Sequence, residues 1–139
     1  MKVILSIKPK YVERILSGKK KYEFRKVIFK EPVDEVIIYA SSPVKKFVAT
    51  FKIGAIIKDE PSSLWIKCNG DSGIAKNEFF EYFKDQNYGF AIKIEKLIKF
   101  DQPIHPKKID SDFIAPQSFK YFEYDQLWKK NRILKTEVV

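Results

Sequence analysis

Hydrophobic and polar residues alternate along much of this chain in the pattern of short strands. Tyr22 and Phe24, for example, alternate with charged residues on both sides. A period of two favours a half-buried strand, and a short continuous apolar run favours a fully buried one. The candidate strands lie at 3–7, 20–29, 36–39, 47–57 and 88–100.

Helical spacing is confined to short segments between and after these strands. Pro9 suits the first turn of a helix, where its missing N–H costs nothing, and Gly18 suits the position just past the last turn. Leu64, Trp65 and Cys68 follow a second helix start near Pro61. Further helices are expected around Phe79, Phe80 and Phe83, with Asn77 as the cap, and at 118–130, where Phe119, Phe122, Leu127 and Trp128 have helical spacing.

Strands dominate this pattern and do not alternate regularly with helices. Gly54 interrupts the 47–57 run, and a glycine inside a strand is typical of a bulge or bend that helps a sheet to curl. We predict an α+β fold, a small barrel or curled sheet of about five to six mostly antiparallel strands with short peripheral helices. The 139 residues suit one domain, 1–139.

The balance of charge bears on the partner rather than on the fold. Lys and Arg number 27 and Asp and Glu 18, so 27 − 18 gives a net charge of +9. Such an excess favours an anionic partner, and nucleic acid is the commonest one. Lysine is also a general solubilising residue, so a charged surface without a partner is the alternative.

Several classes of function are excluded by what the sequence lacks. One cysteine, Cys68, permits no internal disulfide, and one histidine, His105, permits no multi-histidine metal centre. Neither a P-loop nor a dinucleotide-binding glycine motif occurs. No apolar run approaches the ~20 residues that span a bilayer, and the start lacks the apolar stretch of a signal peptide. We expect a cytoplasmic protein with no membrane partner, no cofactor and no metal.

The densest polar cluster lies at 18–25, where the sequence fits G-x-K-x-x-E-x-R. Glu23 and Arg25 are two residues apart, so in a strand their side chains share a face and can pair. The carboxylate then fixes the guanidinium, whose planar fork suits a phosphate or a base edge. Lys20 has the opposite parity and reaches the pair only if the chain is still turning after Gly18. The alternative is an exposed edge strand with ordinary surface charges.

Together with its flanking residues, this motif resembles the opening of an ASCH domain. The family's signature places glycine, lysine, glutamate and arginine at these spacings, and all four are present here as Gly18, Lys20, Glu23 and Arg25. The resemblance covers most of the chain. Further matching segments are Leu5–Pro9, Ile15–Lys20, Tyr39–Pro43, Phe51–Gly54, Gly73–Ile74, Phe79–Phe83, Tyr88–Ile92, Pro103–Ile104 and Pro116–Phe119.

The resemblance implies a PUA-like β-barrel with a basic cleft lined by Lys20, Glu23 and Arg25, to which Lys8 adds positive charge. It implies an RNA- or nucleotide-binding module in RNA-linked or transcriptional regulation. Some small relatives hydrolyse N4-acetylcytidine and another is described as a metal-dependent ribonuclease, so the alternative is a small hydrolase or ribonuclease in which Lys20 and Glu23 are catalytic. The N4-acetylcytidine hydrolases carry a threonine where this chain has Glu23, and the hydroxyl nucleophile is therefore missing.

Two other polar segments are candidates for the same cleft. Ser41 and Ser42 end a strand, and Gln117 and Ser118 precede an aromatic residue, a combination that can hydrogen-bond and stack a base. The plainer alternatives are a simple turn for the first segment and a helix start for the second. The expected partner is RNA or a nucleotide-like ligand. A protein-interaction domain whose charge only keeps it soluble is a third possibility.

Overall fold

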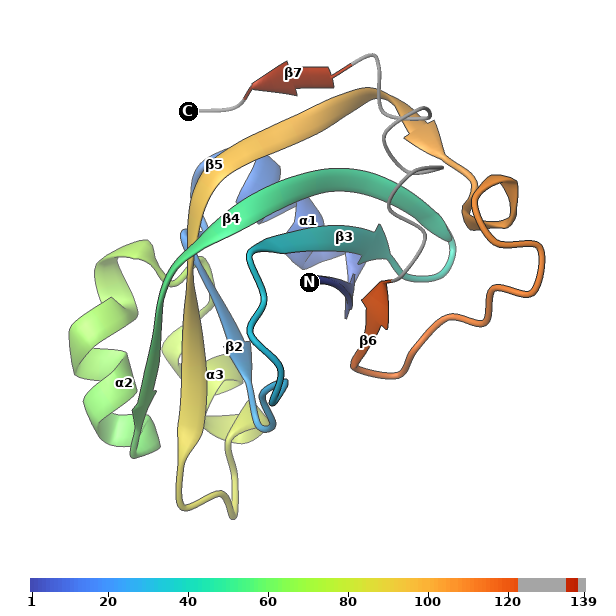
Figure 1. The fold of residues 1–139 in the computed structure, drawn as a ribbon. Helices are drawn as coiled ribbons and strands as arrows, with labels where there is room; N and C mark the ends of the chain where they lie inside the picture. The colour runs from blue at the N-terminus through green and yellow to red at the C-terminus, as the bar shows by residue number, and fades with distance from the viewer. Residues whose placement is uncertain (123–134, 138–139) are drawn as a thin grey trace.

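The strands of this protein join in one mixed sheet that curls strongly around its core (Figure 1). The structure, a computed structural model, describes residues 1–122 and 135–137. The strand order is β2-β5-β4-β3-β1-β6, and β7 pairs with β5. The strands are β1 (Lys2–Ile7), β2 (Tyr22–Arg25), β3 (Glu35–Ala40), β4 (Lys46–Asp59), β5 (Gly89–Ile104), β6 (Phe119–Phe122) and β7 (Lys135–Glu137).

Short helices occupy the connections between these strands. They are α1 (Pro9–Leu16), α2 (Pro61–Cys68) and α3 (Lys76–Tyr82), with 3₁₀ turns η1 (Asn69–Asp71) and η2 (Pro106–Lys108). In α1, Pro9 takes the first helical position, where no backbone N–H is needed, and Gly18 adopts a φ of +82° just after the helix. Both ends of α1 are therefore fixed as the sequence predicts.

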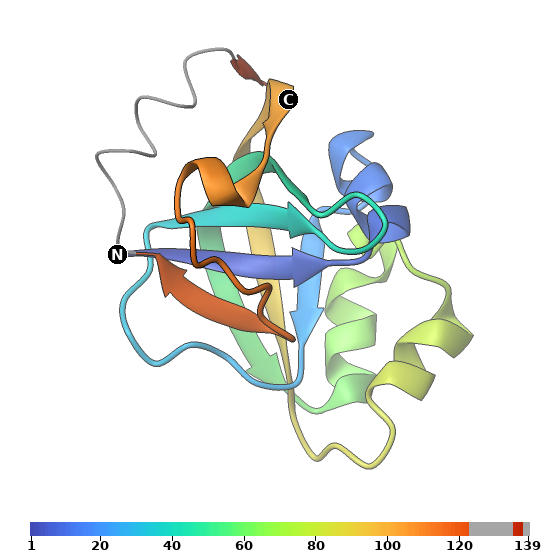
Figure 2. The ribbon, with the colours of Figure 1, turned by 90° about the vertical axis from the view of Figure 1, so that its right-hand side faces the viewer.

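The main core fills the inside of the curled sheet. Alternate residues of β1 and β3, such as Leu5 and Ile38, point into it and are fully buried together with Ile92 of β5 and Ile15 of α1. A second cluster forms where α2 and α3 pack on the β2–β5–β4 end of the sheet. Figure 2 shows these helices, in green to yellow-green, at one side of the molecule. The members of this second cluster are Phe24, Leu64, Cys68, Phe79, Phe83 and Ala91.

The α+β class and the mostly antiparallel sheet are confirmed. Among the described strands, all pairs are antiparallel except β1 with β3. The ladder between β4 and β5 is irregular between Ile53 and Ile56, around Gly54, as expected for a bend there. The path of these strands does not close on itself, because β2 and β6 stand at its two ends.

Three local predictions are wrong. Residues Phe119–Phe122 form strand β6, which pairs with β1, instead of the start of a helix; the rest of the predicted helix, 123–130, lies outside the described residues. Aromatic residues favour a strand wherever a partner strand is available, and β1 provides that partner. The residue that precedes α3 is Ala75 rather than Asn77, and the strand predicted at 20–29 is only Tyr22–Arg25.

Candidate functional site

The side chain of Lys20 is enclosed where α1, β2 and the loop after η1 meet. Its backbone N–H donates to the Arg14 carbonyl (3.0 Å), and its Nζ donates to the Ser72 carbonyl (2.9 Å). Only 3% of Lys20 is exposed. Gly73 has a φ of +62°, and a Cβ there would lie 2.3 Å from the Cβ of Lys20. The loop can therefore close over Lys20 only with glycine at this position.

Two aromatic rings complete the surroundings of the Lys20 ammonium. Its Nζ lies 4.6 Å from the ring centroid of Phe24 and 5.5 Å from that of Tyr11. The Tyr11 hydroxyl donates to Glu78 Oε2 (2.8 Å), which ties α1 to α3 and fixes the Tyr11 ring. The faces of both rings attract a cation, so they partly offset the loss of water around Lys20.

Burial lowers the pKa of Lys20 from 10.5 to about 8. Glu23 acts in the opposite direction, and Arg14 and Arg25 lower the pKa further. The lysines on either side, Lys19 and Lys21, are exposed, and burial is the main cause of the shift. At pH 7 about a tenth of the Lys20 side chains are therefore neutral amines, compared with well under a thousandth for an ordinary lysine.

Glu23 and Arg25 form a buried ion pair on one face of β2, as their spacing predicts. Arg25 Nη2 lies 2.8 Å from Glu23 Oε2, and the two residues are 8% and 7% exposed. Their partners across the ladder on β5 are Ile92 for Glu23 and Phe90 for Arg25. Because directly opposite residues point to the same side, the pair faces the inside of the curled sheet, where Ile92 is fully buried.

Arg25 also connects the two ends of the open sheet. Its Nη2 donates to the Ser6 carbonyl of β1 (2.8 Å), and its Nη1 donates to the Ser118 carbonyl (3.4 Å) and to Ser118 Oγ (3.3 Å). The Arg25 Nε is buried and has no hydrogen-bond partner among the residues that the structure describes. One guanidinium therefore joins β2, β1 and the residue before β6 and retains a donor for a further acceptor.

Tyr82 of α3 and Lys26, the residue directly after β2, contact each other near the motif, and sequence reasoning missed both. Desolvation raises the pKa of Tyr82, Arg25 lowers it and Glu23 raises it, so the hydroxyl is within electrostatic reach of the ion pair. Lys26 Nζ stands 4.8 Å from the centroid of the Tyr82 ring. Lys26 could have been found from the sequence, because it directly follows the motif. Tyr82 could not, because no local sequence pattern indicates that the end of α3 lies next to β2.

The remaining predicted site residues differ in their relation to the motif. Ser118 contacts Arg25 directly, as described above. Lys8 is exposed before α1, and the Ser41 N–H donates to the Ile7 carbonyl at the end of β1 (3.0 Å). Ser42 and Gln117 are exposed. The structure, over residues 1–122 and 135–137, does not bring Lys8, Ser41, Ser42 or Gln117 into a hydrogen bond or ion pair with the motif, so their part in a site stays a prediction.

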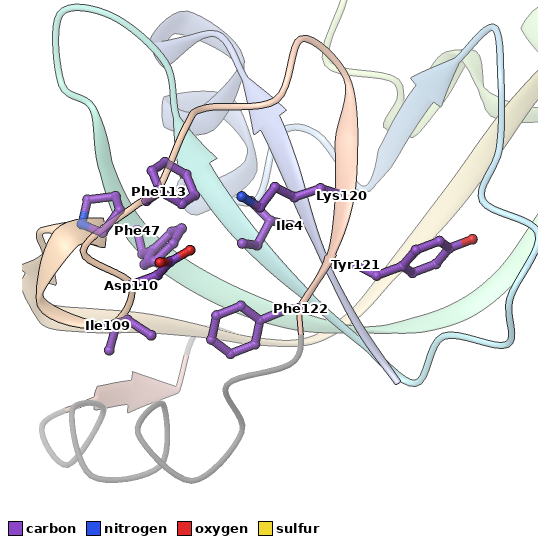
Figure 3. A pocket seen from close by; sticks show the side chains of 9 residues that line it. Ile4, Phe47, Ile109, Asp110, Phe113, Lys120, Tyr121 and Phe122 are labelled. Carbon is purple, nitrogen blue, oxygen red and sulfur yellow. The ribbon is translucent and has the colours of Figure 1, made fainter.

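Two hollows in the molecule lie away from the motif. One of about 290 Å³ lies between the η2 loop and strands β1 and β6, where Lys120 Nζ stands 4.6 Å from the Phe113 ring (Figure 3). The other, of about 430 Å³, lies between α1 and strands β3 to β5, with Glu13 and Lys99 as its charged residues. Neither is lined by Lys20, Glu23 or Arg25, so the basic cleft also stays a prediction.

No group of three or more His, Cys, Asp or Glu side chains in residues 1–122 and 135–137 is placed to hold a metal ion. Over the same part of the chain, no helix has both the length and the apolar character needed to cross a membrane.

The curled sheet with short helices between its strands has the fold of an ASCH-type domain of the PUA-like class. The crystal structure of an ASCH protein from Zymomonas mobilis superposes with a TM-score of 0.84 and 25% identity, over 94% of both chains. The resemblance found in the sequence is thus confirmed. The chain belongs to the family described as "Domain of unknown function (DUF365)", whose model matches residues 1–114.

Two curated proteins are similar to this chain over most of its length. An "ASCH domain-containing ribonuclease" from Zymomonas mobilis subsp. mobilis is 28% identical over 133 residues, which is 91% of this chain and 87% of that protein. A protein named "ATP synthase subunit alpha" from Ureaplasma parvum serovar 3 is 30% identical over 102 residues. That second match covers 73% of this chain but only 13% of the Ureaplasma protein, so it concerns one segment of a much longer chain.

Proposed function

We propose that this domain binds RNA and holds a phosphodiester group at the Lys20–Glu23–Arg25 cluster. The observation that carries the proposal is that all three charged side chains are buried, with Lys20 within electrostatic reach of Glu23 and Arg25, in a chain similar over 91% of its length to a protein named as a ribonuclease. Arg25 retains a buried Nε–H without a partner among the described residues, and a phosphate oxygen is a suitable acceptor. The net charge of +9 would add attraction along the RNA backbone.

Binding of a labelled RNA pool at several salt concentrations tests this proposal. We expect affinity to fall steeply between about 50 and 200 mM salt, because bound phosphates displace counterions. Lys20→Met should weaken binding, and Lys107→Met, which removes an exposed lysine on η2, is the matched control. If wild-type protein binds no RNA at the lowest salt, the proposal is wrong.

Cleavage of the bound RNA is the second candidate, and the lowered pKa of Lys20 is the observation that favours it. The neutral amine would accept the proton of a ribose 2′-hydroxyl, whose oxygen attacks the adjacent phosphorus. The bond from phosphorus to the 5′ oxygen then breaks, and that oxygen takes a proton from water. The products are a 2′,3′-cyclic phosphate and a 5′-hydroxyl. Glu23, within electrostatic reach of Lys20, would keep the amine oriented.

A defined RNA oligonucleotide distinguishes binding from cleavage. We expect cleavage to rise with pH and to level off near the Lys20 pKa of about 8. Lys20→Met should abolish cleavage, and a substrate with a 2′-deoxy sugar at the cleaved position should stay intact. Parallel reactions with divalent metal, with a chelator and with N4-acetylcytidine test the other activities of similar domains. Equal cleavage by wild type and Lys20→Met would assign the activity to a contaminant.

A further inference from the structure

The register of three strands places a row of side chains beside Arg25. Phe90 of β5 lies opposite Arg25 of β2, and Lys58 of β4 lies opposite Phe90. Opposite residues in antiparallel strands point to the same side of the sheet. The three side chains therefore form one row across β2, β5 and β4.

This row lies on the face of the sheet that α2 and α3 do not cover. The helices pack on the other face, through Phe24, Ala91 and Ile57 from the same three strands. In the neighbouring row, Ile56 lies opposite the buried Ile92 and is itself 41% exposed. The sheet thus presents a partly open surface that begins at the ion pair and continues outward to β4.

Aromatic rings and a cation meet at the outer part of this surface. Lys58 Nζ lies 5.2 Å from the ring centroid of Tyr88 and 5.9 Å from that of Phe90. Tyr88 is 53% exposed, Lys58 is exposed and Phe90 is half-buried. An exposed ring next to a lysine combines a stacking surface for a base with a positive charge for the adjacent phosphate.

We propose that Tyr88, Phe90 and Lys58 form a platform for single-stranded RNA that leads to Arg25. The inference rests on the proposed function and names the form of RNA that the site takes. Only unpaired, splayed bases expose their faces to aromatic side chains, whereas a duplex stacks its bases on one another. The positive charge of the exposed Lys58 matches a phosphate backbone better than it matches an apolar protein partner.

Binding to single-stranded and duplex RNA of one sequence tests the platform. We expect wild type to bind the single strand at least about tenfold more tightly, and Tyr88→Ala to lose about tenfold for the single strand. Tyr88→Phe keeps the ring and should bind as wild type does. Lys58→Met should weaken binding, unlike the control Lys107→Met. Ile66→Ala, an exposed apolar residue of α2, controls for lost surface area.

The outcomes separate this inference from the proposed function. If wild type binds RNA but Tyr88→Ala binds equally well, or if duplex and single strand bind alike, the platform is wrong and RNA binding stands. If wild type binds no RNA of either form, both are wrong. Because Tyr88 is largely exposed, the variant should unfold at the same urea concentration as wild type, and this measurement excludes misfolding as the cause of a lost affinity.

Discussion

Replacing Lys20 with methionine would show whether the buried ammonium destabilises the fold. The pKa of Lys20 falls from 10.5 to about 8 in the folded protein. Since one pKa unit corresponds to about 1.4 kcal/mol, holding this side chain charged near pH 7 costs the folded state about 3 kcal/mol. Methionine fills a similar space without a charge but loses the hydrogen bond to Ser72, worth about 1 kcal/mol. We expect Lys20→Met to be more stable than wild type by about 2 kcal/mol.

The dependence of protein stability on pH gives a second, independent test of the cost of the buried ammonium. Between about pH 8 and 10.5 the unfolded chain holds a proton on Lys20 that the folded chain has released, so wild-type stability rises with pH. The variant lacks this titration. The extra stability of Lys20→Met over wild type should therefore shrink above pH 8, and by pH 9.5 it should be smaller by about 2 kcal/mol.

Urea unfolding at a series of pH values measures both effects. The difference between wild type and Lys20→Met cancels the titration of every other group that the change leaves untouched. Lys107→Met should show no such difference at any pH, because Lys107 is exposed. If Lys20→Met is less stable than wild type at pH 7, by an amount that does not change with pH, the ammonium stabilises the fold and the reasoning is wrong.

Three further changes test the surroundings of the cluster. Gly73→Ala puts a Cβ 2.3 Å from Lys20 Cβ at a φ of +62° and should cost more than about 2 kcal/mol in urea unfolding, whereas Gly70→Ala meets nothing within 4 Å and should cost none; equal effects would contradict the packing argument. Arg25→Gln leaves Glu23 buried without its partner and should cost about 3–5 kcal/mol in the same assay, more than the double variant Glu23→Gln/Arg25→Gln; a double variant at least as unstable would refute this. Tyr11→Phe removes the hydrogen bond to Glu78, so it should cost about 1 kcal/mol at pH 7. Because the Tyr11 pKa is raised to about 12, wild type should lose stability above about pH 10, and the variant should lose less; an unchanged high-pH slope would contradict the shift.

Local patterns in the sequence are sufficient for the parts of the site that lie within one element. The spacing of Glu23 and Arg25 predicts a shared face, and the structure places their side chains 2.8 Å apart. Pro9 and Gly18 predict both ends of α1 for reasons of backbone geometry. These predictions need no knowledge of which segments meet.

The rest of the site depends on contacts between distant segments. Lys20 has the wrong parity for the strand face of Glu23, and its position is set by Ser72, more than fifty residues away. The platform beside Arg25 depends on the register of β4 against β5, which the irregularity around Gly54 shifts. The spacing of Phe119 and Phe122 predicts a helix at 119–122, but pairing with β1 decides the structure of that segment.

Arg25 hydrogen-bonds across the open sheet, so a substitution of this residue affects the fold as well as the proposed site. Any substitution of Arg25 removes the hydrogen bond between β2 and β1 as well as the proposed phosphate contact. Stability and ligand binding therefore cannot be changed independently at this residue. Lys58 and Tyr88 lie on the outer surface, where substitutions leave the contact between β2 and β1 intact. Related domains could therefore acquire new ligand preferences at those outer positions while keeping the same arginine.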